Sequence, residues 1–119
     1  MHSHHLSPAV LRTRLIRGID PCQIAKATIL RQGETVCTVR AWHYRKTGAF
    51  AGLAMALSGT LADGGQSEHA LIVSALPEGV RIEEEDVLQL DAGRYRIAGV
   101  APWPAAGEPA VITLTLREL

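Results

Sequence analysis

The residues best suited to nucleophilic catalysis are two histidines and three serines. His43 falls in one predicted strand and His69 begins another, while Ser58, Ser67 and Ser74 lie in the middle of the chain. A nucleophilic serine needs a base within hydrogen-bond reach and often stands in a tight turn such as GxSxG. None of the three serines has this setting, and the spacing suggests no acid that would orient either histidine. We therefore predict no catalytic residue and no enzymatic activity.

The side chains best suited to binding a metal ion are the four consecutive acids at residues 83–86 and three histidines among the first five residues. Successive side chains of an extended chain point in opposite directions, so four acids in a row do not converge on one cation. The histidines lie at a terminus, where chains fray, and Cys22 and Cys37 form no CxxC pair. No GxxxxGK[ST] or GxGxxG motif is present. We predict no metal and no cofactor, and we expect the acidic run to be a solvated turn or a contact for a basic partner.

Composition indicates one domain with its own core. The chain has 119 residues, 47% of them hydrophobic, and its formal net charge is zero. Basic residues predominate in residues 1–47, which have a net charge of +6, whereas residues 48–119 have a net charge of −6. This segregation arises either by chance or because complementary poles favour head-to-tail packing of identical copies. No apolar run reaches the ~18 residues of a membrane helix, and we expect neither a signal peptide nor a membrane partner.

The order of elements predicts a mainly β protein. Ser7 and Pro8 are typical of a helix start, and Gly18 is a plausible helix end. Period-two patterns and turn residues then indicate about six short antiparallel strands, at residues 26–30, 35–44, 69–77, 87–90, 94–101 and 110–119. We expect a tail and short helix at residues 1–25, and a small antiparallel β-barrel at residues 26–119. The helix needs a surface to dock on, either its own barrel or a neighbour.

One long loop, residues 45–67, interrupts this order. Loops longer than about 15 residues are uncommon in compact domains and are often functional. This segment contains five glycines and several large apolar residues, so it is poorly suited to standing alone in water. It either covers an open end of the core or inserts into another subunit, and we favour the second. Its large apolar residues include Phe50, Leu53, Met55 and Leu57.

Small barrels also bind single-stranded nucleic acids through aromatic and basic side chains. Trp42 and Tyr44 share a strand face with Arg40, which keeps a nucleic-acid-binding or peptide-binding module open as an alternative function. The balanced net charge disfavours a polyanion as the main partner.

The closing part of the chain follows a distinct pattern. Asp86 and Leu88 form a D-x-L motif, and a short turn leads to Tyr95, Ile97 and Val100, followed by a loop and a final strand. In this pattern and in its element order, the chain resembles the head–tail joining proteins of long-tailed bacteriophages, in particular the head-tail attachment, or head-closure, proteins of lambda-like phages. The resemblance covers most of residues 24–119 in element order and is specific over residues 86–116.

The resemblance implies a structural role in the virion. Copies would form a homo-oligomeric ring at the phage neck, with portal or adaptor proteins on the head side and tail terminator or tube proteins on the tail side. A loop would help to close the channel, close to the DNA. The location would be the virion neck, and the bacterial host cytoplasm during assembly. Another tail or baseplate protein with a small barrel is an alternative.

Several residues are candidates for contacts with partners or between subunits. Tryptophan is enriched at interface hot spots, and Trp103 stands between two prolines, where it either contacts a partner or caps its own core. The predicted contact residues are Phe50, Leu53, Met55, Leu57, Trp103, Arg40, Arg45, Glu84 and Glu85.

Overall fold

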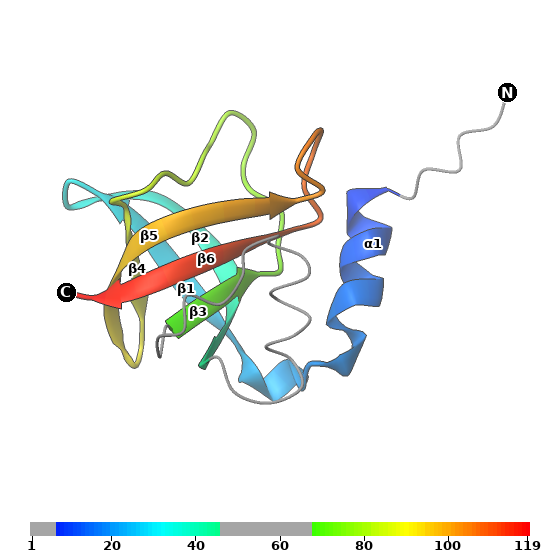
Figure 1. Ribbon diagram of the computed structural model, residues 1–119, viewed down its shortest axis with the longest axis horizontal. Coiled ribbons are helices and arrows are strands. Elements are labelled where there is room, and N and C mark those ends of the chain that lie inside the picture. Colours follow the sequence, from blue (N-terminus) through cyan, green and yellow to red (C-terminus); the bar gives the residue numbers. More distant parts are fainter. Residues whose placement is uncertain (1–6, 46–67) are drawn as a thin grey trace, which may run out of the picture.

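A closed barrel of six antiparallel strands forms the body of the protein (Figure 1). The computed structural model describes residues 7–45 and 68–119. Around the barrel the strands follow the order β1-β2-β3-β6-β5-β4. Their bounds are β1 (Ile24–Arg31), β2 (Glu34–Arg45), β3 (Glu68–Ile72), β4 (Val87–Leu90), β5 (Gly93–Trp103) and β6 (Val111–Glu118). The prediction of a mainly β fold with a short N-terminal helix and a six-strand barrel is confirmed.

Alternation along the strands decides which side chains fill the barrel. Every second residue of a strand points inward, so one strand supplies a regular series to the core. Cys37, Val39 and Ala41 of β2 belong to this core. The other buried members are Ala27, Ile29, Ala70, Ile72, Ile82, Leu88, Ile97, Ile112, Leu114 and Leu116. Leu90 and Val100 are partly buried and pack against this core.

The hairpin between β1 and β2 depends on two residues with positive φ. Gln32 has φ 53° and Gly33 has φ 83°. Two consecutive residues in the left-handed region give the turn that matches the twist of the flanking strands. Gly33 therefore supports the tight turn that the sequence predicted here.

A second apolar cluster lies on the outside of the barrel. Alternation turns Trp42 and Tyr44 outward, where they meet Leu71, Val73 and Val111 and the buried Ile19. We call this set of residues the outer cluster. Further residues pack against it and are partly buried: Leu15, Ile16, Ile24 and Trp103. The N-terminal segment therefore docks on its own barrel, which is one of the two surfaces expected for the helix.

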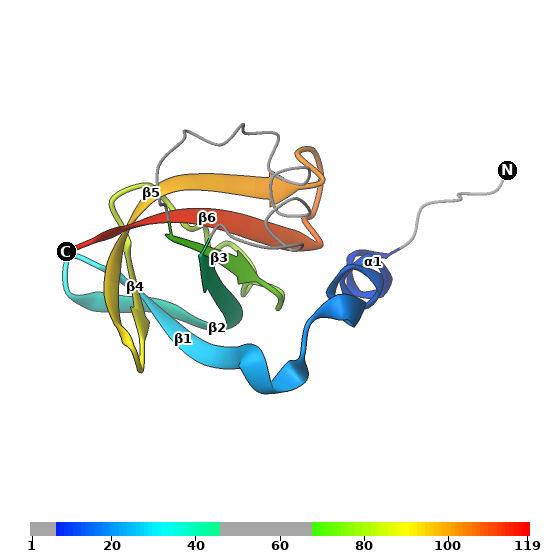
Figure 2. The same ribbon diagram turned by 60° about the horizontal axis from the view of Figure 1, so that its bottom comes forward.

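The N-terminal segment contains α1 (Pro8–Leu15) and two 3₁₀ turns, η1 (Ile16–Gly18) and η2 (Pro21–Gln23). The Ser7 side chain caps α1 by accepting a hydrogen bond from the Val10 amide at 3.2 Å. Figures 1 and 2 show α1 beside the barrel, on the side where β5 ends and β6 begins. No residue of α1 is fully buried. The helix is thus held mainly at its C-terminal end.

The third strand is shorter than predicted. It ends at Ile72, whereas the apolar run extended the prediction to Pro77. The Val73 amide still donates to the Arg40 carbonyl at 2.9 Å, but the Arg40 amide donates to the Ser74 hydroxyl at 3.0 Å. A side chain has taken the place of a backbone carbonyl, so the ladder stops and the chain leaves the sheet.

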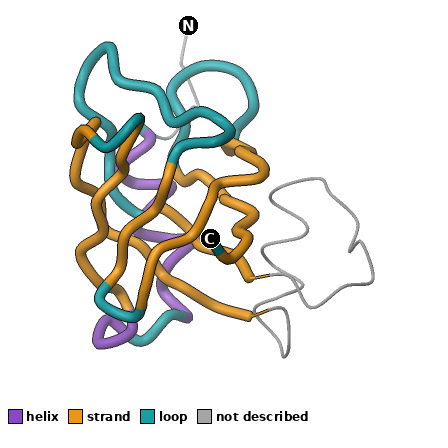
Figure 3. Tube along the Cα trace, turned by 90° about the vertical axis from the view of Figure 1, so that its left-hand side faces the viewer, coloured by secondary structure: helices purple, strands orange, loops and turns teal. Residues whose placement is uncertain are grey.

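Residues 73–86 then connect β3 to β4, and we call them the link. Most of the loop structure, including the link, lies above the strands in Figure 3. Residues 80–86 contain two buried side chains. Ile82 is in the core, and Asp86, the last of the four acids expected to form a solvated turn, is only 2% exposed. The link is therefore part of the folded body, because its own side chains close one end of the barrel.

Candidate functional site

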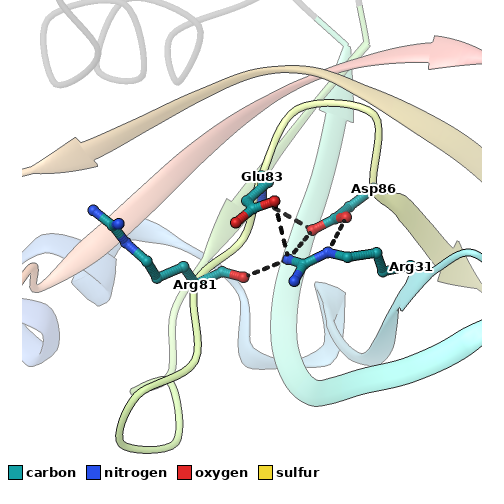
Figure 4. A network of polar contacts seen from close by, with 4 residues as sticks. All are labelled: Arg31, Arg81, Glu83 and Asp86. Carbon is teal, nitrogen blue, oxygen red and sulfur yellow. Dashed lines mark hydrogen bonds and ion pairs between the residues drawn. The ribbon is translucent and has the colours of Figure 1, made fainter.

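A charged network ties the link to the end of β1 (Figure 4). The Arg31 guanidinium donates to both carboxylate oxygens of Asp86, with Nε 2.8 Å from Oδ1 and Nη2 2.9 Å from Oδ2. The same Nη2 donates to the carbonyl of Arg81 at 2.9 Å and lies 3.8 Å from Glu83 Oε1. A bidentate arginine–carboxylate pair fixes the orientation of both side chains as well as their positions. Arg31 therefore holds three points of the link at once.

The Asp86 carboxylate is held in its charged form. Burial acts to raise its pKa, but the hydrogen bonds from Arg31 and from the Glu83 amide outweigh this effect, so the pKa of Asp86 lies below its ordinary value. The Glu83 amide donates to Oδ2 at 2.8 Å. Asp86 in turn raises the pKa of Arg31. Both partners are thus charged throughout the ordinary pH range.

Backbone hydrogen bonds shape the acidic turn around this pair. The Asp86 amide donates to the Glu83 carbonyl at 3.1 Å, and Glu85 adopts a positive φ of 76°. Glu85 and Asp86 also exchange backbone hydrogen bonds of 2.8 Å with Ile97 of β5. Glu84 and Glu85 therefore point into solvent, and Glu85 lies 3.9 Å from Arg96. Both predicted contact residues are exposed on a firmly held turn.

A cleft of about 510 Å³ opens between the link and the loop that joins β5 to β6. We call it the loop cleft. Its link wall includes Leu76 and Val80, which are half-buried and pack against the barrel core. Glu78 and Glu108, one from each wall, are exposed. The complete lining is Ser74, Leu76, Pro77, Glu78, Gly79, Val80, Glu108, Pro109, Ala110, Val111 and Ile112.

The helix α1 is attached at the side of this cleft. Arg12 Nε donates to the carbonyl of Ala110 at 2.7 Å, and Ala110 is itself a lining residue. Arg14 and Arg17 are exposed. A basic helix and an acidic cleft are therefore neighbours within one chain.

The predicted aromatic surface is covered in the structure. Trp42 and Tyr44 are stacked with ring centroids 4.4 Å apart, and they are 6% and 8% exposed. Tyr44 also stacks on His69 at 5.5 Å. Burial raises the pKa of Tyr44. Because their faces are occupied by other side chains, Trp42 and Tyr44 do not offer a platform on which nucleic-acid bases stack.

The other predicted contact residues lie in different places. Arg40 is exposed on β2, and its backbone bonds to the start of the link. Trp103 is partly buried against the outer cluster, so it caps part of its own fold. Arg45 is the last residue of β2 and pairs in register with Glu68 of β3. The predicted loop contacts Phe50, Leu53, Met55 and Leu57 lie outside the described residues.

A small polar cluster lies where residues 46–67 leave and rejoin the barrel. His43 Nε2 lies 3.5 Å from Glu68 Oε2, and the His43 ring is 5.0 Å from that of Tyr95. Among residues 7–45 and 68–119, no three His, Cys, Asp or Glu side chains are placed to hold a metal ion. No helix in the same part of the chain is long and apolar enough to cross a membrane.

The Arg31–Asp86 pair and the loop cleft were missed in the sequence. One signal for Asp86 was present, because it stands two residues before the inward-facing Leu88 and therefore shares its side of an extended chain. Arg31 gave no signal, since 55 residues separate it from Asp86. The cleft is built by two loops, and period-two patterning does not describe loops.

Neither the models of known protein families nor the curated proteins contain a match to this chain.

Proposed function

We propose that this chain is a structural protein of the bacteriophage neck, where copies form a ring that joins the DNA-filled head to the tail. The observation that carries the proposal is the closed six-strand barrel, together with the place in it of the head–tail joining pattern. Asp86, Leu88 and Ile97 of that pattern are all buried. Three of the five residues that carry the resemblance therefore belong to the folded interior.

The connection between β2 and β3 also supports this proposal. Arg45 and Glu68 are paired neighbours, so residues 46–67 leave the barrel and return to it at one place. A chain segment inserted in this way can be long without any change to the barrel. In the family that the chain resembles, a loop of this kind helps to close the channel, and we propose the same role for residues 46–67.

Partners on both sides of a ring require surfaces on different parts of the subunit. The acidic turn with Glu84 and Glu85, the loop cleft, and the exposed face of α1 are three such surfaces. They belong to elements that lie outside the strand ladder. We propose that the barrel is the rigid body of the joint and that these elements make its contacts.

The test is electron microscopy of particles from a phage in which this gene carries an early stop codon. We expect DNA-filled heads beside separate, finished tails, because a missing joint leaves both halves complete. Supplying the intact gene from a plasmid is the control and must restore whole virions. Whole virions without the plasmid, or heads that carry aberrant tails, would contradict the proposal.

A further inference from the structure

The loop cleft is acidic and partly apolar. Its lining contains two acids, Glu78 and Glu108, and no basic side chain. Both acids are exposed, and the lining also contains the half-buried Leu76, Val80 and Pro109. Such a surface fits an occupant that presents an apolar side chain flanked by positive charges.

The helix α1 presents such a face to solvent. Val10, Arg14 and Arg17 are separated by four and three residues, a spacing that places them on one side of a helix that continues into η1. All three are exposed, and Val10 and Leu119 are the exposed large hydrophobic residues among those described. No acid occurs between Pro8 and Gly18. We call these three residues the outward face of α1.

The opposite side of the helix is already engaged with its own barrel. Leu15 and Ile16 pack against the outer cluster, and Arg12 donates to the Ala110 carbonyl at the side of the cleft. These contacts direct Val10, Arg14 and Arg17 away from the barrel of their own chain. The cleft of the same chain is therefore not the surface that this face meets.

We propose that the occupant of the loop cleft is the outward face of α1 from a second copy of this chain. Val10 would pack on Leu76 and Val80, while Arg14 and Arg17 would pair with Glu78 and Glu108. Such a contact joins two different surfaces, so it repeats from copy to copy and closes into a ring where the rotation allows. This inference rests on the proposed function, for which it supplies the contact between subunits.

Disulfide trapping between two differently tagged chains tests the contact. Both chains carry Cys22→Ser, which removes the exposed thiol, while Cys37 is buried. One chain carries Arg14→Cys and the other Glu78→Cys. The control partner carries Ala92→Cys, an exposed position in the turn between β4 and β5. We expect the Arg14–Glu78 pair to cross-link at least about tenfold faster than the control pair, and equal rates would overturn the proposal.

Charge reversal tests the same contact without new thiols in the interface. Sedimentation of mixed chains at low salt measures association. Reversing the helix (R14E with R17E) or the cleft (E78R with E108R) should each weaken association about tenfold, because like charges then meet. Mixing the two reversed chains should restore it, and raising the salt should weaken the unmodified contact. R117E, a reversal of an exposed charge on β6, is the control and should have no effect.

The outcomes separate this inference from the proposed function. Cross-linking with intact virions after the stop codon would support the contact and reject the neck role. Separate heads and tails, with no cross-linking and no restoration by mixed reversed chains, would reject the contact alone. If R14E with R17E abolishes binding of a random DNA duplex but leaves association in sedimentation unchanged, the outward face binds DNA and the proposed contact is wrong.

Discussion

Arg31, the last residue of β1, holds the carboxylate of Asp86 through two nitrogens at 2.8 and 2.9 Å. Asp86 is the residue immediately before β4, so this pair joins the end of one strand to the start of its neighbour. The pair therefore fixes the point at which the link ends and β4 begins.

Replacing Asp86 with asparagine should destabilise the protein by about 1–3 kcal/mol. The amide is similar in size but cannot accept a charged hydrogen bond on both of its terminal atoms, so part of the Arg31 and Glu83 contacts is lost. Urea unfolding measures the change. Glu84→Gln, which alters an exposed acid in the same turn, should stay within ~0.5 kcal/mol. Similar losses in both variants would mean that the pair does not secure the link.

The contribution of Asp86 should also depend on pH. Its pKa is lower in the folded protein than in the unfolded chain, so folding favours the charged form. The stabilisation is complete well above the ordinary carboxyl pKa of about 3.9 and is lost as pH falls through the folded pKa below it. The difference in unfolding free energy between the wild type and Asp86→Asn should therefore shrink from pH 7 toward pH 3. A constant difference over this range would contradict the assignment.

The strand positions were predictable because the alternation of apolar and polar residues is recognisable even in short strands. All six predicted strands are present, and β4 has the predicted bounds. The end of β3 was not predictable, because it depends on one hydroxyl, that of Ser74, accepting from Arg40, 34 residues earlier. The apolar residues after Ile72 continue the pattern but pack as part of the link.

The candidate site was less predictable than the barrel. Glu84, Glu85 and Arg40 are exposed as predicted, but the loop cleft depends on how the link and the β5–β6 loop meet in space. The burial of Trp42 and Tyr44 was not predictable from the strand pattern. Alternation placed Trp42 and Tyr44 on one strand face with Arg40, yet the N-terminal segment and other strands bury the two aromatic side chains.

Trp103 allows the two interpretations of its role to be separated. Trp103→Ala should reduce the free energy of unfolding by roughly 2 kcal/mol, less than a fully buried tryptophan, because the side chain is only partly buried against the outer cluster. Thermal or urea unfolding gives this value. Val10→Ala, at an exposed position, should leave stability nearly unchanged. A Trp103→Ala protein of normal stability that fails to join heads to tails would identify Trp103 as a partner contact.

Residues 48–65 should be dispensable for folding and necessary for assembly. Arg45 and Glu68 are already neighbours, so a short glycine–serine connection can replace the segment without disturbing β2 or β3. We expect cooperative unfolding within a few degrees of the wild type. The same variant should fail to restore virions when it is supplied to the stop-codon phage. Loss of folding would instead assign the segment to the barrel core.

Closure of the barrel has a consequence for what happens when copies of the chain meet. Each of the six described strands has hydrogen-bonded neighbours on both sides. None of these strands is therefore an edge strand, the element that commonly recruits a strand from another molecule in irreversible aggregation. Copies that meet by chance associate mainly through side-chain contacts, and such contacts can break and re-form.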